Sequence, residues 1–219
     1  MIVAAPGRLS YAAGLALQLA ARERVLAGGP DELLLLEHDP VVTLGRRGGA
    51  VDRAALARLC VPVVATDRGG LATWHGPGQL TGYPIVDLRR RHLSVGEFVA
   101  TLGHLLEALC AASGVVATWD AARPGVYAGG RKLGSIGLHV HRGVTTHGFA
   151  LNVDCDLAGF AAITPCGATD LAMSTLAREA PVAPTVPQVL EAARRAFLAA
   201  WPAPGGDRAG HGSAQGQRE

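Results

Sequence analysis

The sequence predicts an α/β chain of the α+β type, with mixed sheets flanked by helices. Two long segments, 9–27 and 94–112, place apolar residues at helical spacing. Shorter runs rich in Val, Leu and Ile lie between and after them, as strands would. Two of these runs flank Arg142-Gly143, a pair suited to a hairpin turn. Helices that alternate with short strands, some of them hairpins, favour a mixed sheet with helices on its faces.

The elements are expected in a definite order, and Gly and Pro residues mark their limits. Gly28, Gly29 and Pro30 end the first helix, and Asp39-Pro40 separates the first two strands. After the first helix we expect strands over 33–38 and 41–44, a short helix over 53–60, a strand over 61–66, a Gly-rich stretch without periodicity over 68–82, a strand over 83–88, the helix over 94–112, strands over 114–119, 125–128, 131–141 and 144–153, a helix after Cys166 and a helix over 187–201.

Residues 1–202 are expected to form one domain, and residues 203–219, rich in Gly, Pro, Ser and Gln, are expected to be disordered. With 49% hydrophobic residues the chain can bury a core, and a net charge of +2 gives no reason to expect nucleic acid or a membrane as partner. No run reaches the roughly 20 apolar residues that cross a bilayer. Tyr11 and Gln18 interrupt the apolar N-terminal stretch, which indicates an amphipathic helix rather than a signal peptide. We therefore expect a cytoplasmic protein with reduced thiols.

The basic residues are almost all arginine. Of the 20 Lys and Arg residues 19 are Arg, and Lys132 is the only lysine. A surface cation tolerates exchange for Arg, whereas a position that needs an amine able to lose its proton does not, because Arg stays charged. Lys132 is therefore a candidate functional residue. The alternative is a solvated lysine on an edge strand, where it would guard against aggregation.

A glycine-rich segment covers 68–79, with four glycines and a proline in twelve residues. Its polar side chains, Arg68, Thr73, His75 and Gln79, offer donors to a carbonyl, a phosphate or a polar head group. Its glycines would let the backbone approach a ligand closely, although a purely structural crossover explains them equally well. The spacing is not that of a phosphate-binding P-loop.

Three histidines lie on predicted strands. His147 begins a conspicuous segment, HGFALNV, but a lone His is more often structural than catalytic. His139 and His141 alternate on one face of a strand, and no third ligand is spaced to join them. We therefore expect neither a metal site nor a cofactor.

Cys166 has an unusual setting for a cysteine, between Pro165 and Gly167. Pro165 restricts Thr164 to extended conformations, and Gly167 permits a sharp turn. The sulfur is expected to project from this bend, where a substrate can reach it. Backbone N–H groups exposed at such a bend could bind an oxyanion.

The other cysteines are weaker candidates. Cys60 and Cys110 end apolar, helix-like segments and are expected to be buried small hydrophobes. Cys155 lies between Asp154 and Asp156, whose charges would raise the pKa of the thiol and disfavour the thiolate.

Four segments occur in a specific order: RGGLATWHGPGQLTGYP (68–84), GRKLGSIG (130–137), HGFALNV (147–153) and PCG (165–167). Together they resemble the lipoyl(octanoyl) transferases, over about 65–177, with weaker likeness over 37–45. The resemblance implies the fold of the biotin and lipoate protein ligase catalytic domains. It also implies transfer of an octanoyl group, without ATP, from octanoyl acyl carrier protein to a lysine of lipoyl domains. The implied acceptors are the 2-oxoacid dehydrogenase complexes and the glycine cleavage H protein, in the first step of endogenous protein lipoylation.

Residue by residue, the resemblance assigns the acyl thioester to Cys166 and the lysine that tunes this thiol to Lys132. Trp74 stands where the family usually has tyrosine, and Phe149 where it usually has leucine. Both would lie along the acyl chain, which leaves the chain-length preference open. The implied acyl-substrate contacts are Arg68, Gly69, Gly70, Leu71, Ala72, Thr73, Trp74, His75, Ser135, Ile136, Gly137, Gly148, Phe149 and Ala150.

The expected mechanism is ping-pong: Cys166 takes the acyl group, and Lys132 acts as a base, a charge partner or both. Three other functions stay open. An ATP-dependent lipoate or biotin protein ligase of the same fold would form an adenylate and need no cysteine. A thiol hydrolase would activate Cys166 with His75 or His147. A non-catalytic acyl-carrier binding module would bind the carrier and never form an acyl-enzyme.

Overall fold

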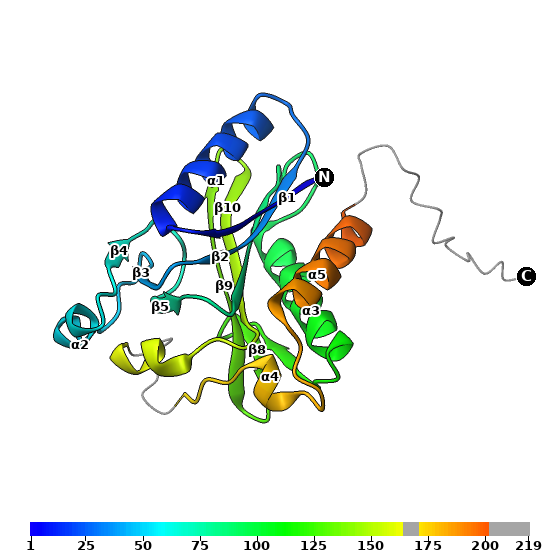
Figure 1. Ribbon diagram of the computed structural model, residues 1–219. Helices are drawn as coiled ribbons and strands as arrows, with labels where there is room; N and C mark the ends of the chain where they lie inside the picture. The colour runs from blue at the N-terminus through cyan, green and yellow to red at the C-terminus, as the bar shows by residue number, and fades with distance from the viewer. Residues whose placement is uncertain (164–170, 202–219) are drawn as a thin grey trace, which may run out of the picture.

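A seven-stranded mixed sheet lies at the centre of the molecule (Figure 1). The computed structural model describes residues 1–163 and 171–201. The strand order is β1-β2-β6-β10-β9-β8-β7. β1 and β2 are parallel, joined through helix α1, and every other neighbouring pair in this sheet is antiparallel. The strands are β1 (Ile2–Leu9), β2 (Glu32–His38), β6 (Gln79–Ile85), β7 (Thr118–Asp120), β8 (Gly125–Ala128), β9 (Arg131–His141) and β10 (Val144–Asn152).

A second sheet of three strands has the order β4-β3-β5. It consists of β3 (Val41–Leu44), β4 (Val63–Ala65) and β5 (Ala72–His75). Helix α2 (Arg53–Arg58) and the 3-10 helix η1 (Leu157–Ala162) accompany it. Val42, Leu56, Trp74 and Phe160 form its apolar cluster, separate from the main core.

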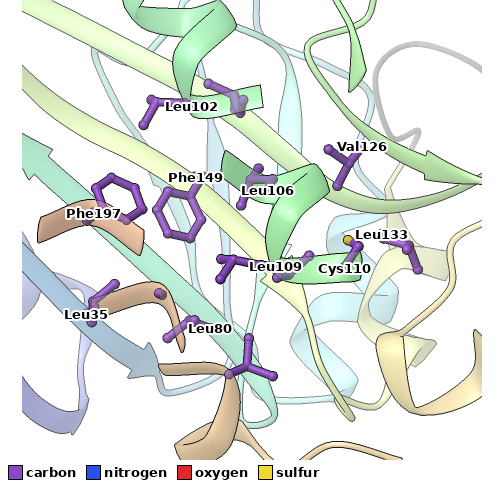
Figure 2. Packing of buried hydrophobic residues seen from close by; sticks show 14 of the residues in the cluster. Leu35, Leu80, Leu102, Leu106, Leu109, Cys110, Val126, Leu133, Phe149 and Phe197 are labelled. Carbon is purple, nitrogen blue, oxygen red and sulfur yellow. The ribbon is translucent and has the colours of Figure 1, made fainter. Parts of the chain in front are cut away.

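The two faces of the large sheet are covered differently (Figure 1). Helices α3 (Val95–Ala112) and α5 (Val186–Ala200) pack on one face and bury the main core with it, as Figure 2 shows for Phe149, Phe197 and the leucines of α3. Helix α1 (Tyr11–Leu26) packs against β2, β6 and β10 with Leu34, Tyr83 and Ile85 among its partners. A short helix, α4 (Leu176–Glu179), precedes α5. The expected fold class, mixed sheets flanked by helices, is confirmed.

Helix α3 begins with a capping box, in which Ser94 and Glu97 satisfy each other's backbone N–H groups. Among the described helices, α3 alone is long and apolar enough, by length and composition, to cross a membrane. Its apolar face packs in the core instead: Phe98, Leu102 and Leu106 are buried against the sheet and α5. Core helices of this composition are common.

The structure confirms most of the predicted elements, including the bounds of β9 and the hairpin to β10. At this hairpin Arg142 and Gly143 both have positive φ, 51° and 89°, as a type I′ turn requires. Two expectations were wrong. Residues 2–9 form a strand, β1, and the Gly-rich stretch over 68–82 contains β5 and most of β6.

The physical reasons for these two errors differ. β1 lies at the edge of the sheet with most of its residues exposed, so its sequence shows no alternation of apolar and polar residues. β6 contains Gly82 and Pro84, which disfavour a central strand, yet it lies between β2 and β10. Tertiary packing on both faces overrides the local preference there.

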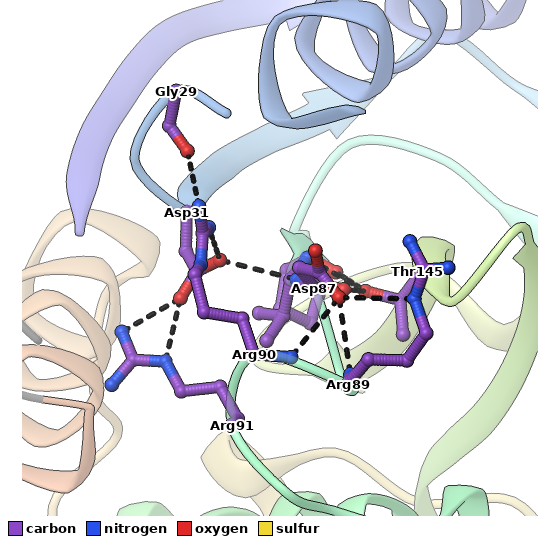
Figure 3. A network of polar contacts seen from close by, with 9 residues as sticks. Gly29, Asp31, Asp87, Arg89, Arg90, Arg91 and Thr145 are labelled. Atoms are coloured by element: carbon purple, nitrogen blue, oxygen red, sulfur yellow. Dashed lines mark hydrogen bonds and ion pairs between the residues drawn. The ribbon is translucent and has the colours of Figure 1, made fainter. Parts of the chain in front are cut away.

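A buried carboxylate ties the start of β2 to the turn after β6 (Figure 3). Asp31 accepts hydrogen bonds from Arg90 Nη2 and Arg91 Nε, both at 2.7 Å, and from the backbone N–H of Asp87 at 3.1 Å. Arg90 also donates to the carbonyl of Gly29 at 2.8 Å. The Asp31 side chain is fully buried, so the paired guanidinium groups compensate for its lost hydration.

Candidate active site

Lys132 is buried, with only 1% of the residue exposed. Its Nζ lies 5.3 Å from the centre of the Tyr127 ring and 3.5 Å from the carbonyl oxygen of Pro124. The side chain lies against Gly125, where an added Cβ would come within 2.6 Å of Lys132 Cε. The interpretation as a solvated edge-strand lysine is therefore wrong, because β9 is an inner strand and the amine is packed inside.

The chain that follows the Cys166 segment is hydrogen-bonded to the backbone of Lys132. The Lys132 N–H donates to the carbonyl of Ala172, and the Ser174 N–H donates to the carbonyl of Lys132, both at 2.9 Å. Asn152 Nδ2 donates to the carbonyl of Ser174 at 3.0 Å. Residues 172–174 are thus held beside Lys132 from two sides. Cys166 itself, with residues 164–170, lies outside the described residues.

Glu179 strengthens this attachment. It accepts a hydrogen bond from Ser174 Oγ at 2.6 Å and forms a two-pronged ion pair with Arg131, with both N···O distances at 2.7 Å. The hydrogen bonds from Arg131 and Ser174 lower the pKa of the Glu179 carboxyl to about 2.

A depressed pKa of Glu179 predicts a specific dependence of stability on pH. The carboxylate contributes its stabilisation above the ordinary value of 4.5 and loses it as the pH falls toward 2. We expect Glu179→Gln to flatten the fall in unfolding free energy across this window, relative to the wild type. Urea unfolding between these pH values measures it. Equal slopes for the two proteins would show that the pair contributes nothing there.

A cavity of about 310 Å³ opens beside Lys132. This volume is at the lower end of the range of small-molecule sites. Its wall includes Lys132 and Met173 from the elements just described, and Phe160 of η1. Two groups of predicted substrate contacts also line it: Arg68, Gly69, Gly70, Leu71, Ala72, Thr73, Ser135, Ile136 and Gly137. We call it the large cavity.

Close backbone packing shapes the wall formed by residues 68–73. The Gly69 N–H donates to the carbonyl of Leu138 at 2.8 Å, and a Cβ on Gly137 would lie 2.9 Å from the Gly69 oxygen. A Cβ on Gly45 would collide with the carbonyl oxygen of Gly70. These glycines therefore allow the strand and the loop to pack closely. From the sequence alone, a role in ligand approach and a purely structural role were equally possible.

Arg68 holds this loop to the small sheet. Its guanidinium donates to Thr43 O at 2.7 Å, to Thr43 Oγ1 at 2.9 and 3.1 Å, and to Gly69 O at 3.0 Å. The side chain was expected to offer donors to a substrate. Its described hydrogen bonds fix the shape of the cavity wall, and its contact with a substrate stays a prediction.

His75 belongs to a buried polar relay. Its Nδ1 lies 2.7 Å from Gln79 Oε1 and its Nε2 lies 3.3 Å from Thr43 Oγ1. Gln79 Nε2 donates to Asn152 Oδ1 at 2.9 Å, and Asn152 reaches Ser174 as described. Burial lowers the pKa of His75 to about 3, so the imidazole is neutral at physiological pH. The relay links the glycine-rich segment to Ser174, whose N–H donates to the carbonyl of Lys132.

A small cavity of about 30 Å³ continues from the large one. Both share Arg68, Thr73, Ser135 and Gly137, but Lys132 lines only the large cavity. The predicted contacts His75, Gly148, Phe149 and Ala150 line the small cavity, as do three residues that sequence reasoning missed, Tyr11, Thr81 and Tyr83. The two cavities together form one candidate site between the sheets.

His147 also lines the small cavity and has a positive φ of 57°, a conformation that is uncommon for a residue other than glycine. Its Nε2 lies 2.6 Å from Asp67 Oδ1, and its N–H donates to Gln18 Oε1 at 2.8 Å. His139 lies 3.6 Å from the same carboxylate, whereas His141 is exposed.

The rings of two predicted acyl contacts pack in apolar clusters, although Phe149 also lines the small cavity. The Trp74 ring packs against Phe160 at 5.5 Å between centroids, in the cluster of the small sheet, and does not line either of the two cavities described. The Phe149 ring stacks on Phe197 at 5.5 Å and fills the space over Gly82, so it belongs to the main core (Figure 2).

The remaining cysteines divide into buried and exposed. Burial raises the pKa of Cys110 to about 12, and burial followed by the charges of Asp154 and Asp156 raises that of Cys155 to about 12. Cys60 is exposed with a φ of 54°, so its expected burial was wrong: it lies past the end of α2 in a turn.

The chain is similar to known proteins over most of its length. Residues 10–198 match the model of the lipoyl protein ligase A/B catalytic domain. The chain belongs to this family. It is 44% identical over 198 residues to an octanoyltransferase of Mycolicibacterium gilvum, covering 88% of this chain and 82% of that one. It is 47% identical over 175 residues to an octanoyltransferase of Thiobacillus denitrificans, covering 80% and 79%.

Solved structures of the family share the fold at low sequence identity. The bi-partite lipoate protein ligase of Thermoplasma acidophilum has a TM-score of 0.67 and 18% identity, over 91% of this chain and 83% of that chain. A lipoate-protein ligase A bound with ATP has a TM-score of 0.69 and 17% identity, over 90% and 83%. The expected ligase-like fold is confirmed.

The sequence contained a signal for only some of the candidate-site residues that sequence reasoning missed. Asn152 ends the HGFALNV segment and was visible there, but its partners were not. Tyr11 opens a helix and Thr81 lies in a run with no periodicity, so neither carried a signal. His38, whose Nε2 lies 2.6 Å from Tyr83 Oη, belonged to the weaker likeness upstream.

Proposed function

We propose that this protein transfers an octanoyl group from octanoyl acyl carrier protein to a lysine of lipoyl domains, through a thioester on Cys166. The observation that carries the proposal is the position of Lys132. The only lysine of the chain is buried in the wall of a cavity sized for a small ligand, beside residues 172–174, which follow the Cys166 segment.

Chain connectivity supports a role for Cys166 at this cavity. Before the segment, Phe160 lines the large cavity and Ile163 pairs with Val51. After it, Met173 lines the same cavity and pairs with Lys132. Cys166 follows Ile163 by three residues, which span at most about 11 Å of extended chain. Cys166 is therefore flanked in sequence by residues that line or adjoin the large cavity, which supports the proposal that its thiol acts there.

The chemistry balances without a cofactor. The Cys166 thiolate attacks the donor thioester, a new thioester forms, and the carrier thiol leaves. Exchange of one thioester for another is close to isoenergetic, so no ATP is needed. The acceptor amine then attacks the acyl-enzyme, an amide forms and Cys166 is released. A cationic Lys132 favours the thiolate, and a neutral Lys132 can take the proton of the attacking amine.

The proposed acceptors are the lipoyl domains of 2-oxoacid dehydrogenase complexes and the glycine cleavage H protein, in the cytoplasm. The octanoyltransferase names of relatives at 44–47% identity support this substrate class over ATP-dependent ligation. The thiol hydrolase has less support, because described partners already engage both ring nitrogens of His75 and the Nε2 of His147.

The experiment is intact-mass measurement after incubation with octanoyl acyl carrier protein and no ATP. We expect the wild type to gain one octanoyl group and an apo lipoyl domain to discharge it. Cys166→Ser should gain no thioester, whereas Cys60→Ser, which removes an exposed cysteine, should behave as the wild type. Acylation that appears only with octanoate and ATP would favour the ligase. Free octanoate as the main product would favour the hydrolase. Binding of the carrier protein without any adduct would favour the binding module.

A further inference from the structure

The small cavity contains buried hydroxyl groups that the proposed reaction does not use. Tyr11 Oη and Thr81 Oγ1 are buried and have no hydrogen-bond partner within the described part of the chain. Both residues line the small cavity. A buried polar group without a partner costs free energy, so such groups in native proteins usually bind a ligand or an ordered water.

Two other polar residues of this cavity, Tyr83 and His147, contrast with these two. Tyr83 Oη lies 2.6 Å from His38 Nε2, and His147 Nε2 lies 2.6 Å from Asp67. Each therefore has a partner in the protein. Tyr11 and Thr81 approach the cavity from different elements, α1 and β6, which the sheet brings together.

The size and position of the small cavity indicate which part of an acyl chain can enter it. Its volume of about 30 Å³ is enough to hold an ordered water molecule. Lys132 lines the large cavity, and Ser135, which lines both cavities, lies three residues farther along β9. An acyl chain with its carbonyl near Lys132 that runs along β9 therefore points its far end at the small cavity.

We propose that the small cavity is a hydrogen-bonding subsite for the ω-end of the acyl chain, in which Tyr11 and Thr81 bind one oxygen atom. The oxygen is a water molecule beyond a shorter chain, or the hydroxyl of an ω-hydroxyacyl chain that reaches it. A methyl group pushed into the cavity displaces the oxygen and leaves both hydroxyls without a partner. Sites built to hydrogen-bond a hydroxyl discriminate strongly against its apolar analogue.

This inference rests on the proposed acyl transfer and adds a substrate preference to it. The test compares kcat/KM for acyl carrier protein thioesters of 8 to 12 carbons with ω-hydroxyacyl thioesters of equal heavy-atom number. Once the chain reaches the cavity, we expect the wild type to prefer the ω-hydroxy member by about tenfold. We expect Thr81→Val and Tyr11→Phe, tested separately, each to abolish most of this preference. Each variant should also raise kcat/KM for longer apolar chains relative to kcat/KM for octanoyl.

The ratio of kcat/KM for two thioesters, measured on one protein, does not depend on how much of that protein is folded. The preference of the wild type is measured without any variant. Thr101→Val on α3, outside the cavity, is the matched control and should keep the wild-type ratio. No preference for the ω-hydroxy member at any length in the wild type, or a preference unchanged in both variants, would overturn the subsite. If octanoyl is transferred in either case, the proposed function survives. Absence of octanoyl transfer by the wild type would instead count against the proposed function.

Discussion

Lys132→Arg should lose about 10²- to 10⁴-fold in the rate of octanoyl transfer, the range that a lost general base costs. Arginine keeps the positive charge but stays protonated at any working pH, so it cannot take the proton of the attacking amine. Single-turnover transfer to an apo lipoyl domain measures the second step, and the mass of the acyl-enzyme measures the first.

The packing of Lys132 calls for a second variant. The side chain lies against Gly125 with little space, so a larger guanidinium could also fail for steric reasons. Lys132→Met has a similar length without the amine and serves as the matched control. Loss in both variants with native melting curves assigns the effect to the amine. Turnover at the wild-type rate by Lys132→Arg would remove the proton-transfer role.

Asp31→Ala should lower the free energy of unfolding by about 3 kcal/mol, the lower end of the cost of breaking a buried ion pair. The carboxylate is fully buried and accepts from Arg90, Arg91 and the Asp87 backbone, so its loss leaves these donors without their acceptor. The two guanidinium groups are partly exposed and recover some hydration, which keeps the cost from being larger. Urea unfolding with an unchanged m-value measures it.

The matched control for this change is Glu23→Ala on α1. Glu23 pairs with Arg22 at the surface, where an ion pair contributes about 0–1 kcal/mol. A similar loss of stability in both variants would mean that the Asp31 network contributes no more than a surface pair. Because Asp31 is remote from both cavities, transfer by the folded variant should be unchanged at low temperature.

The fold could be predicted from sequence where local pattern and final structure agree. The helical spacing of α3 and the alternation along β9, with Arg142-Gly143 after it, are local features that survive in the structure. Only the end of β6 lay in the strand expected over 83–88. The rest could not be predicted, because Gly82 disfavours a strand and only pairing with β2 and β10 forms one. The same holds for β1, an exposed edge strand.

For the candidate site, the sequence by itself determined which residues to consider. One lysine among twenty basic residues and one cysteine between proline and glycine are facts of composition and order, and no folding is needed to see them. Tertiary structure decided where the described residues lie. It buried Lys132, turned Trp74 and Phe149 into separate clusters, and brought Tyr11 and Thr81 to one cavity. These outcomes depend on contacts between residues far apart in the chain, which no local pattern contains.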